Sequence, residues 1–392
     1  MKIITRTIWI LSVISLFTDV ASEMLYPIIP VYLKTIGFSV VLIGILEGVA
    51  EAIAGYSKGY FGRLSDHNGK RLPFVQLGYL LSAISRPMMA IFTFPIWVFG
   101  ARTLDRMGKG IRTGARDAML SDEATESTKG KVFGFHRSLD TLGAVIGPSL
   151  ALWYLYYHPG AYRILFFISF IPGLLSVGLT LLLRDKERAV KNTNASTSVF
   201  SFLHYWKESS TMYRKVVIGL VTFALFNSSD VFLLLKAKDA GLNDTWVIGV
   251  YVFYNLIYAI FSFPFGVLAD KIGLKKTYII GLFLFAIVYL GMAINTSLYG
   301  YFALFFLYGV YSAATEGISK AWISNITDKK DTATAIGTYA GFQSIAAMLA
   351  SSIAGIIWYK IGASATFFAT AFITFMVLMY FLVFIPATSK NN

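Results

Sequence analysis

The sequence predicts an all-helical membrane protein with twelve transmembrane helices in two pseudo-symmetric six-helix bundles. The first observation behind this is composition, since mean hydropathy is +0.64 and only 14% of the 392 residues are charged, against about 25% in soluble domains. The second is that the apolar residues form long blocks rather than a helical or strand period. Because about 18 apolar residues in a row suffice to cross a bilayer as a helix, these blocks predict membrane spans.

The sequence contains twelve apolar segments of this kind. Their approximate bounds are 7–33, 39–61, 73–93, 95–118, 131–155, 162–183, 214–236, 245–269, 276–294, 298–325, 333–359 and 363–387. The longest polar stretch lies between the sixth and seventh segments and predicts a linker. We therefore expect an N-terminal bundle over 1–184, a cytoplasmic linker over 185–213 and a C-terminal bundle over 214–392.

The net charge of +13 is concentrated in short loops, which favours membrane topology over nucleic-acid binding. Connections from odd to even segments are nearly bare of Lys and Arg, whereas connections from even to odd segments hold clusters such as Lys271, Lys275 and Lys276. By the positive-inside rule the clusters face the cytoplasm, so both termini are predicted to be cytoplasmic in a multi-pass inner-membrane protein. Absence of cysteine excludes disulfides and thiol chemistry.

The two halves repeat. The decapeptide Gly62–Arg71 has its counterpart in Gly266–Lys275 at an offset of 204, and two shorter matches, one before it and one after it, keep the same order at offsets of 209 and 203. Internal repeats underlie many transporter folds, in which substrate binds near the bilayer midplane between the repeats.

The decapeptide carries the most specific signature in the chain. It presents Gly62, Asp66, Gly69, Lys70 and Arg71 in a pattern that resembles the loop between the second and third helices of the major facilitator superfamily, and the resemblance extends over the whole chain. Glycines allow a tight turn, and an aspartate can accept from the N–H groups at a helix start. The resemblance implies that the aspartate latches the two halves on the cytoplasmic side. A positive-inside turn without a gating role is the alternative.

A second signature lies on the fourth segment. Arg106, Gly110 and Gly114 resemble a pattern of the same family in which the arginine is linked to proton coupling. Lys109 and Arg112 stand where the family usually has uncharged residues, so this helix is unusually basic.

A third signature lies on the fifth segment, where 143–148 resembles the glycine–proline element of drug:proton exporters. Ala151 and Leu152 occupy the positions where paired glycines complete that element, which weakens the inference of export.

Ionisable residues inside membrane helices are costly and suggest function. Asp19 and Glu23 share one face of the first helix, and the basic residues of the fourth segment form one stripe. Either every buried charge is permanently paired, or at least one carboxylate titrates as an arginine approaches it. The predicted proton-coupling residues are Asp19, Glu23, Arg102, Asp105, Arg106 and Asp140, with Asp19 and Arg106 as the leading pair. We favour protons over sodium, because the sequence shows no unwound helix rich in carbonyl donors.

The second half carries few buried charges, which suggests that it shapes specificity. The offset of 204 sets Glu316 opposite Arg112, and these two residues are expected to pair across the central cavity. The predicted substrate-binding residues are Arg112, Arg116, Asp230, Glu316 and Lys320. No metal-ligand spacing, phosphate-binding loop or catalytic constellation is present, so we expect no metal, no cofactor and no enzymatic activity.

The sequence therefore suggests a secondary active transporter that works by alternating access. Proton-coupled efflux of small organic compounds, by antiport, is the first hypothesis. Proton-coupled uptake of an organic anion or metal chelate is the second, and a non-transporting receptor or lipid-moving protein on the same scaffold is the third. The expected partners are a small-molecule substrate, protons and membrane lipid, and we expect a monomer.

Overall fold

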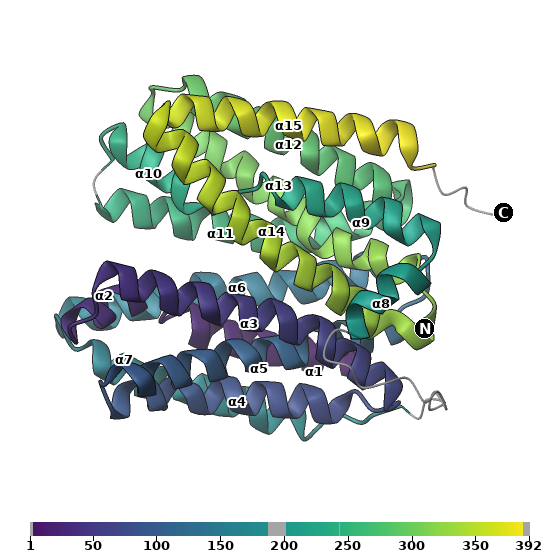
Figure 1. The fold of residues 1–392 in the computed structure, drawn as a ribbon, viewed down its shortest axis with the longest axis horizontal. Helices are drawn as coiled ribbons and strands as arrows, with labels where there is room; N and C mark the ends of the chain where they lie inside the picture. Colours follow the sequence, from purple (N-terminus) through teal and green to yellow (C-terminus); the bar gives the residue numbers. More distant parts are fainter. Residues whose placement is uncertain (1–2, 187–200, 243, 387–392) are drawn as a thin grey trace. The chain divides into compact units, whose positions relative to one another are not determined.

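The computed structural model describes residues 3–186, 201–242 and 244–386 (Figure 1). These residues form α-helices, one 3₁₀ helix and no strand. The helices are α1 (Arg6–Glu23), α2 (Ile29–Thr35), α3 (Val40–His67), α4 (Leu72–Ile91), α5 (Pro95–Asp122), α6 (Lys129–Tyr157), α7 (Tyr162–Thr180), α8 (Ser201–Glu208), α9 (Thr211–Ala224), α10 (Val231–Asp239), α11 (Asp244–Ile272), α12 (Leu274–Ile294), α13 (Leu298–Asn325), η1 (Lys329–Asp331), α14 (Thr332–Lys360) and α15 (Ala363–Phe384). The all-helical prediction is confirmed, whereas much of the predicted linker, 187–200, lies outside the described residues.

Ten of the twelve predicted segments coincide with one helix each. The other two are broken, because the first segment forms α1 and α2, and the seventh forms α9 and α10. In the described residues, seven helices are long and apolar enough to span a membrane by themselves. The remaining predicted spans are the two broken ones and the three charge-bearing helices α3, α5 and α6.

The chain forms two compact units. The first comprises Met1–Glu123, Leu139–Glu208 and Asp328–Ser344, and the second comprises Ala124–Ser138, Ser209–Thr327 and Ile345–Asn392. The first unit thus includes the beginning of α14, and the second includes the beginning of α6. The predicted boundaries at 184 and 214 stay a prediction.

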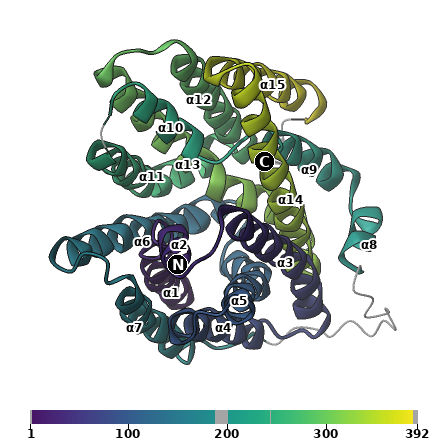
Figure 2. The same cartoon turned by 60° about the vertical axis from the view of Figure 1, so that its left-hand side comes forward.

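The first unit is a bundle whose helices α1, α4, α5 and α7 run side by side (Figure 2). Glycines bring the backbones of α3, α5 and α14 into direct contact. A Cβ atom on Gly62 of α3 would lie 2.5 Å from the carbonyl oxygen of Ala333 on α14. One on Gly110 of α5 would lie 2.8 Å from the carbonyl oxygen of Ala54 on α3. These positions therefore require glycine.

The second unit repeats this close approach between α6 and α11. A Cβ atom on Gly134 would lie 2.6 Å from the carbonyl oxygen of Ser262, and Gly266 contacts Gly130. Gly62 and Gly266 occupy equivalent places in the sequence repeat, so both halves use the same glycine for the same purpose. Repeat matches in the sequence thus mark helix contacts in the structure.

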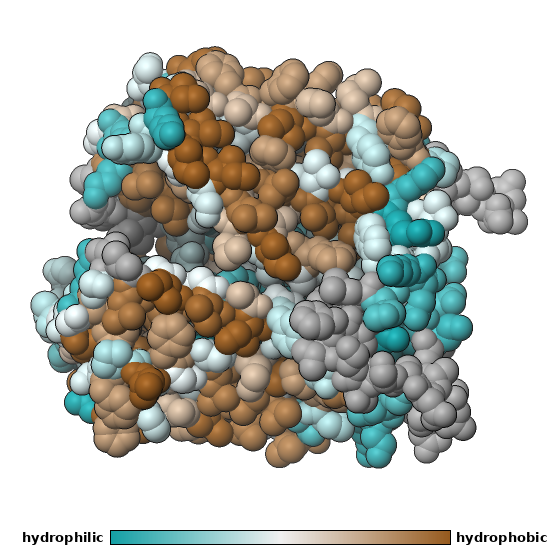
Figure 3. All heavy atoms as spheres, in the orientation of Figure 1, coloured by the Kyte–Doolittle hydropathy of each residue, from teal (hydrophilic) through white to brown (hydrophobic). Residues whose placement is uncertain are grey.

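The outward faces of the helices are apolar. On α15, exposed hydrophobic side chains include Phe372, Phe375 and Met376, which are 65%, 55% and 56% exposed. Figure 3 shows hydrophobic residues along the visible faces of α15 and α3. Large apolar surface of this kind is expected where a helix faces lipid tails rather than water.

Candidate functional site

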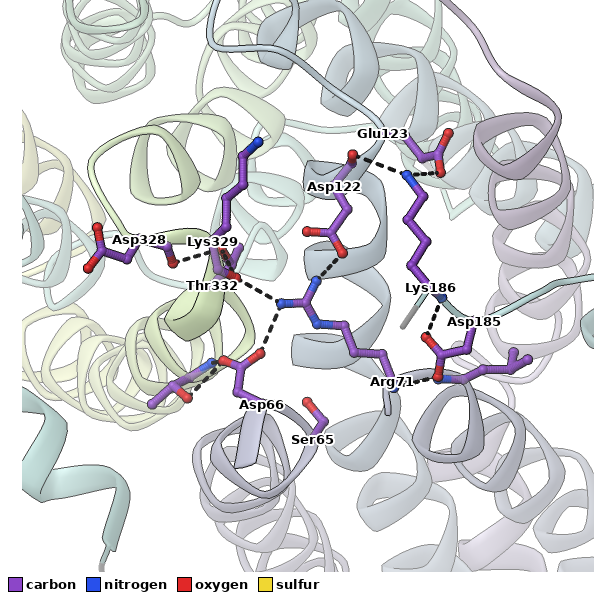
Figure 4. A network of polar contacts seen from close by, with 12 residues as sticks. Ser65, Asp66, Arg71, Asp122, Glu123, Asp185, Lys186, Asp328, Lys329 and Thr332 are labelled. Atoms are coloured by element: carbon purple, nitrogen blue, oxygen red, sulfur yellow. Dashed lines mark hydrogen bonds and ion pairs between the residues drawn. The ribbon is translucent and has the colours of Figure 1, made fainter. Parts of the chain in front are cut away.

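A buried polar network surrounds Asp66 at the end of α3 (Figure 4). One carboxylate oxygen of Asp66 accepts a hydrogen bond from Arg71 Nη2 at 2.9 Å. The other accepts from the backbone N–H and the hydroxyl of Thr334, at 2.7 and 2.9 Å. Gly69 adopts a φ of 66°, the left-handed conformation needed to turn the chain from α3 into α4. Asp66 therefore binds the first turn of α14, which comes from the other half of the sequence.

Arg71 is fully buried and links this aspartate to three further segments. Its Nη1 donates to Asp122 at the end of α5 over 2.5 Å, and its Nη2 also donates to the carbonyl oxygen of Lys329 over 3.2 Å. Asp185 accepts from the backbone N–H groups of Arg71 and Leu72, at 2.8 and 2.9 Å, at the start of α4. Lys70, by contrast, is exposed.

The second unit contains an equivalent arrangement. The two carboxylate oxygens of Asp270 on α11 accept hydrogen bonds from the backbone N–H groups of Gly130 and Lys131, at 2.8 and 2.9 Å. These residues lie in the first turn of α6, whose N-terminus carries a partial positive charge that favours a carboxylate. Each unit thus has an aspartate that caps a helix from the opposite half of the sequence.

The basic stripe of α5 begins with Arg102, which forms ion pairs with two acidic residues of the first unit. Its Nε and Nη2 donate to the two carboxylate oxygens of Glu47 on α3, both at 2.8 Å, and its Nη1 lies 3.3 Å from Asp105. Two parallel hydrogen bonds of this kind fix the orientation of both side chains. Arg106 lies 3.9 Å from Glu47, so this glutamate serves two arginines.

Arg112 lies deeper, between α5 and α4. Its guanidinium donates to Ser82 Oγ at 2.6 Å and to the carbonyl oxygen of Gly78 at 3.3 Å, and it stacks over the ring of Tyr79 at 4.6 Å. Arg112 is only 5% exposed, and its Nε has no hydrogen-bond partner within the described part of the chain. Neutral groups hold this arginine.

Arg116 joins α5 to α1 and α6. It forms an ion pair with Asp117 at 2.8 Å and donates to Ser15 Oγ at 3.3 Å. Ser15 in turn donates to Asp140 on α6. Asp140 is therefore connected to the basic stripe through a hydroxyl group.

The acidic face of α1 lies among several bases. Asp19 is within electrostatic range of Lys109 and Arg86. Glu23 is within range of Arg106, whose ion-pair partner is Glu47. The structure thus brings the predicted coupling residues into one charged cluster of the first unit, but it gives Arg106 a partner on α3.

In the second unit Glu316 forms an ion pair with Arg137 of α6 at 3.7 Å. The expected pair of Glu316 with Arg112 stays a prediction. Arg137 also donates to the hydroxyl of Tyr258. Lys320 is partly exposed one turn further along α13. Asp230 lies elsewhere in the unit, between α9 and α10, where it accepts a hydrogen bond from Tyr254.

Sequence reasoning left several of these residues out of the site. Glu47 was visible as an intramembrane acid on the same face as Glu51, and this i,i+4 spacing was a usable signal. Asp122 and Thr334 gave no such signal, because their roles depend on contacts between segments far apart in sequence.

The model of the Major Facilitator Superfamily matches residues 11–254 and 237–392. The chain belongs to this superfamily. An uncharacterized MFS-type transporter of Methanocaldococcus jannaschii, MJ1317, is 33% identical over 93% of this chain and 91% of its own length. The protein is thus a membrane-spanning transporter of the superfamily.

Two more distant matches carry names that describe different classes of substrate, drugs in one case and organic anions in the other. A multi-drug resistance efflux pump PmrA homolog of Lactococcus lactis is 24% identical over 91% of this chain and 90% of its own. The crystal structure of the human organic anion transporter MFSD10 superposes with a TM-score of 0.82 at 17% identity, covering 96% of this chain and 99% of that one. At this identity the structural likeness shows the fold alone.

Proposed function

We propose that this protein is a proton-coupled antiporter that exports small organic compounds by alternating access. The observation that carries the proposal is the cluster of the first unit, in which Arg102 and Arg106 share Glu47 while Asp105 lies beside them. Such a cluster is costly inside a membrane, and its charges mark ion pathways in many transporters. We place the protein in the inner membrane, with both termini in the cytoplasm.

The chemistry of coupling follows from charge balance. A carboxylate screened from water takes up a proton more readily, and a guanidinium that approaches it favours release. The Glu47 side chain is 35% exposed while that of Arg102 is 6% exposed, so the acid is the more accessible partner of the pair. Asp19, Glu23 and Asp105 surround the same bases, and a proton taken up by one of them frees a base to bind elsewhere.

The two aspartate caps supply a gate for this cycle. Asp66 holds the start of α14 and Asp270 holds the start of α6 through hydrogen bonds that must break if either helix moves away. Both contacts join segments from opposite halves of the sequence. Their release allows the halves to rock, which is the motion that alternating access requires.

The similarity to the efflux pump homolog of Lactococcus lactis favours efflux over uptake. Arg112 is the observation that favours the second candidate, uptake of an organic anion or metal chelate. Among the described residues, the hydrogen bonds of this buried guanidinium go to Ser82 and Gly78 and not to a carboxylate, so the guanidinium can offer charge to an anion. The direction of substrate movement distinguishes the two candidates.

The coupling proposal is tested with Asp19→Asn in proteoliposomes under an imposed pH gradient. We expect substrate exchange without a gradient to continue, while accumulation driven by the gradient is lost. Asp239→Asn, which changes an exposed aspartate at the end of α10, is the matched control and retains both. Gradient-driven transport that is unchanged in Asp19→Asn would show that this carboxylate does not couple. A thermal-shift screen of metabolites, drugs and siderophores at two pH values identifies the substrate beforehand.

A further inference from the structure

The seventh predicted segment, 214–236, is not one helix. α9 ends at Ala224 and α10 begins at Val231, so the six residues Leu225–Asp230 leave the helix inside a predicted membrane span. Non-helical backbone at membrane depth exposes polar groups, and it persists only where protein, water or a ligand satisfies them. The sequence-based preference for protons over sodium rested on the expected absence of such a stretch.

The equivalent break between α1 and α2 has a simple cause. Pro27 lies within it and Pro30 follows at the start of α2, and proline lacks the N–H group that continues a helix. Met24, Leu25 and Ile28 fill this break and are buried in the apolar core of the first unit. Its own backbone N–H groups form turns, and Met24–Ile28 include no carboxylate, amide or serine side chain, so this break lacks the side-chain ligands of an ion site.

The break between α9 and α10 contains no proline and is polar. Its residues Asn227, Ser228, Ser229 and Asp230 are types whose side chains compete with helical hydrogen bonds. Within the described part of the chain, no donor reaches the carbonyl oxygens of Leu225, Phe226, Asn227 or Ser228. These oxygens follow the C-terminus of α9, which already carries a partial negative charge.

Side-chain oxygens of the break are also available to a ligand. Asn227 donates from its amide nitrogen to the hydroxyl of Tyr311 at 2.9 Å, which fixes the amide, and its buried Oδ1 has no donor among the described residues. Ser228 is 4% exposed, and its hydroxyl lies next to the neutral hydroxyl of Tyr289. Buried oxygens without partners are rare in folded proteins and call for an explanation.

Asp230 completes the group with a carboxylate. It accepts hydrogen bonds from the hydroxyls of Tyr254 and Ser229, and no basic side chain of the described residues lies within ion-pair distance of it. Asp230 is partly buried, and its donors, which are the two hydroxyls and the backbone N–H of Val231, are neutral, so a cation beside the carboxylate is favourable. The break therefore gathers one negative charge and several neutral oxygens with no positive charge among them.

We propose that the break between α9 and α10 is a sodium-ion site formed by Asp230, Asn227, Ser228 and the free carbonyl oxygens of 225–228. Unwound carbonyls and half-helix C-termini are the groups that bind sodium in other transporter folds. A single carboxylate suits a monovalent ion better than a divalent one. The oxygens come from six consecutive residues, a spacing that suits a bare ion better than an organic ammonium. The site lies in the second unit and does not depend on proton coupling in the first.

The test is thermal unfolding of the purified full-length protein in sodium, potassium or choline chloride at equal ionic strength and fixed pH. We expect a saturable rise in Tm of several degrees in sodium alone, because an ion that binds only the folded state stabilises it. Asp230→Asn abolishes this rise. Asn227→Ala and Ser228→Ala each weaken the apparent sodium affinity by about tenfold or more. Asp239→Asn, at the end of α10 and outside the proposed site, leaves the sodium response intact.

Equal Tm values for the unaltered protein in all three salts overturn the proposal. So does a sodium response that persists in Asp230→Asn. If Asp230→Asn does not fold, Asn227→Ala and Ser228→Ala decide whether the site exists. An unchanged sodium affinity in both of these variants contradicts the proposal. A Tm that depends on pH through Asp230 but not on sodium assigns a proton to the carboxylate instead. This experiment measures sodium binding and not transport. Its result therefore stands even if the proposed proton-driven transport is refuted.

Discussion

Replacing Gly62 with alanine tests whether the contact between α3 and α14 is as close as the structure shows. The new Cβ atom would lie 2.5 Å from the carbonyl oxygen and 3.2 Å from the carbonyl carbon of Ala333, and 3.4 Å from Cα of Gly337. All three are backbone atoms of α14, so no side chain can rotate away. An ordinary contact between carbon and oxygen is about 3.3 Å, and the helices must therefore separate by roughly 0.8 Å.

The expected cost follows from two opposing effects. Overpacking of a close contact costs about 1–3 kcal/mol, whereas alanine in place of glycine stabilises a helix by about 0.5–1 kcal/mol. Gly48→Ala on the same helix isolates the second effect, because nothing lies within 4 Å of its Cβ position. The free energy needed to open the contact therefore differs between the two variants by about 1–3 kcal/mol. This corresponds to about a 5- to 150-fold difference in the population in which the contact is open.

The assay uses the absence of cysteine from the chain. Ser65 is fully buried next to this contact, so Ser65→Cys introduces one thiol that reacts with a water-soluble maleimide only when the contact opens. We expect labelling to accelerate in the Gly62→Ala background by the factor above and to stay unchanged with Gly48→Ala. Equal labelling rates in the two backgrounds would refute the argument from backbone contact.

Two further outcomes are expected from the polar contacts. Asp66→Asn removes the charge that binds Arg71 and the start of α14, and it should lower the free energy of unfolding by about 1–3 kcal/mol, measured by thermal unfolding. Asp270→Asn shares no partner with Asp66, so the double variant should equal the sum of the single ones within about 0.5 kcal/mol; a larger discrepancy indicates direct coupling of the two caps. Arg102→Lys cannot keep both hydrogen bonds to Glu47 and should lower the Tm, whereas an unchanged Tm would mean that the paired geometry contributes nothing.

The sequence predicted the helical architecture well, because the signal lies in local composition. Long apolar blocks identify spans wherever the bilayer must be crossed, and ten of them correspond to single helices. The breaks in the first and seventh segments were missed. Pro27 gave a usable signal for the first of these, whereas the second depends on Asn227 and its neighbours, whose types are common inside membrane helices as well.

The candidate site was predicted less completely. Spacing along α5 placed the basic residues on one stripe, yet it did not indicate that Arg102 binds Glu47 or that Arg112 packs against Ser82. Helical periodicity gives the face of a helix but not the helix that this face meets. The predicted pair of Arg112 and Glu316 rested on symmetry and stays a prediction, whereas the spacing gave no signal for the ion pair of Glu316 with Arg137.

By itself, the sequence determined that this protein is a two-halved helical membrane transporter, since hydropathy, basic loops and an internal repeat are properties of single segments and their order. Tertiary structure alone decided which charges pair, which helix start each aspartate caps, and where a span unwinds to present free oxygens. These features depend on atoms brought together from distant parts of the chain. Their energies are set by burial and geometry, which a linear pattern does not contain.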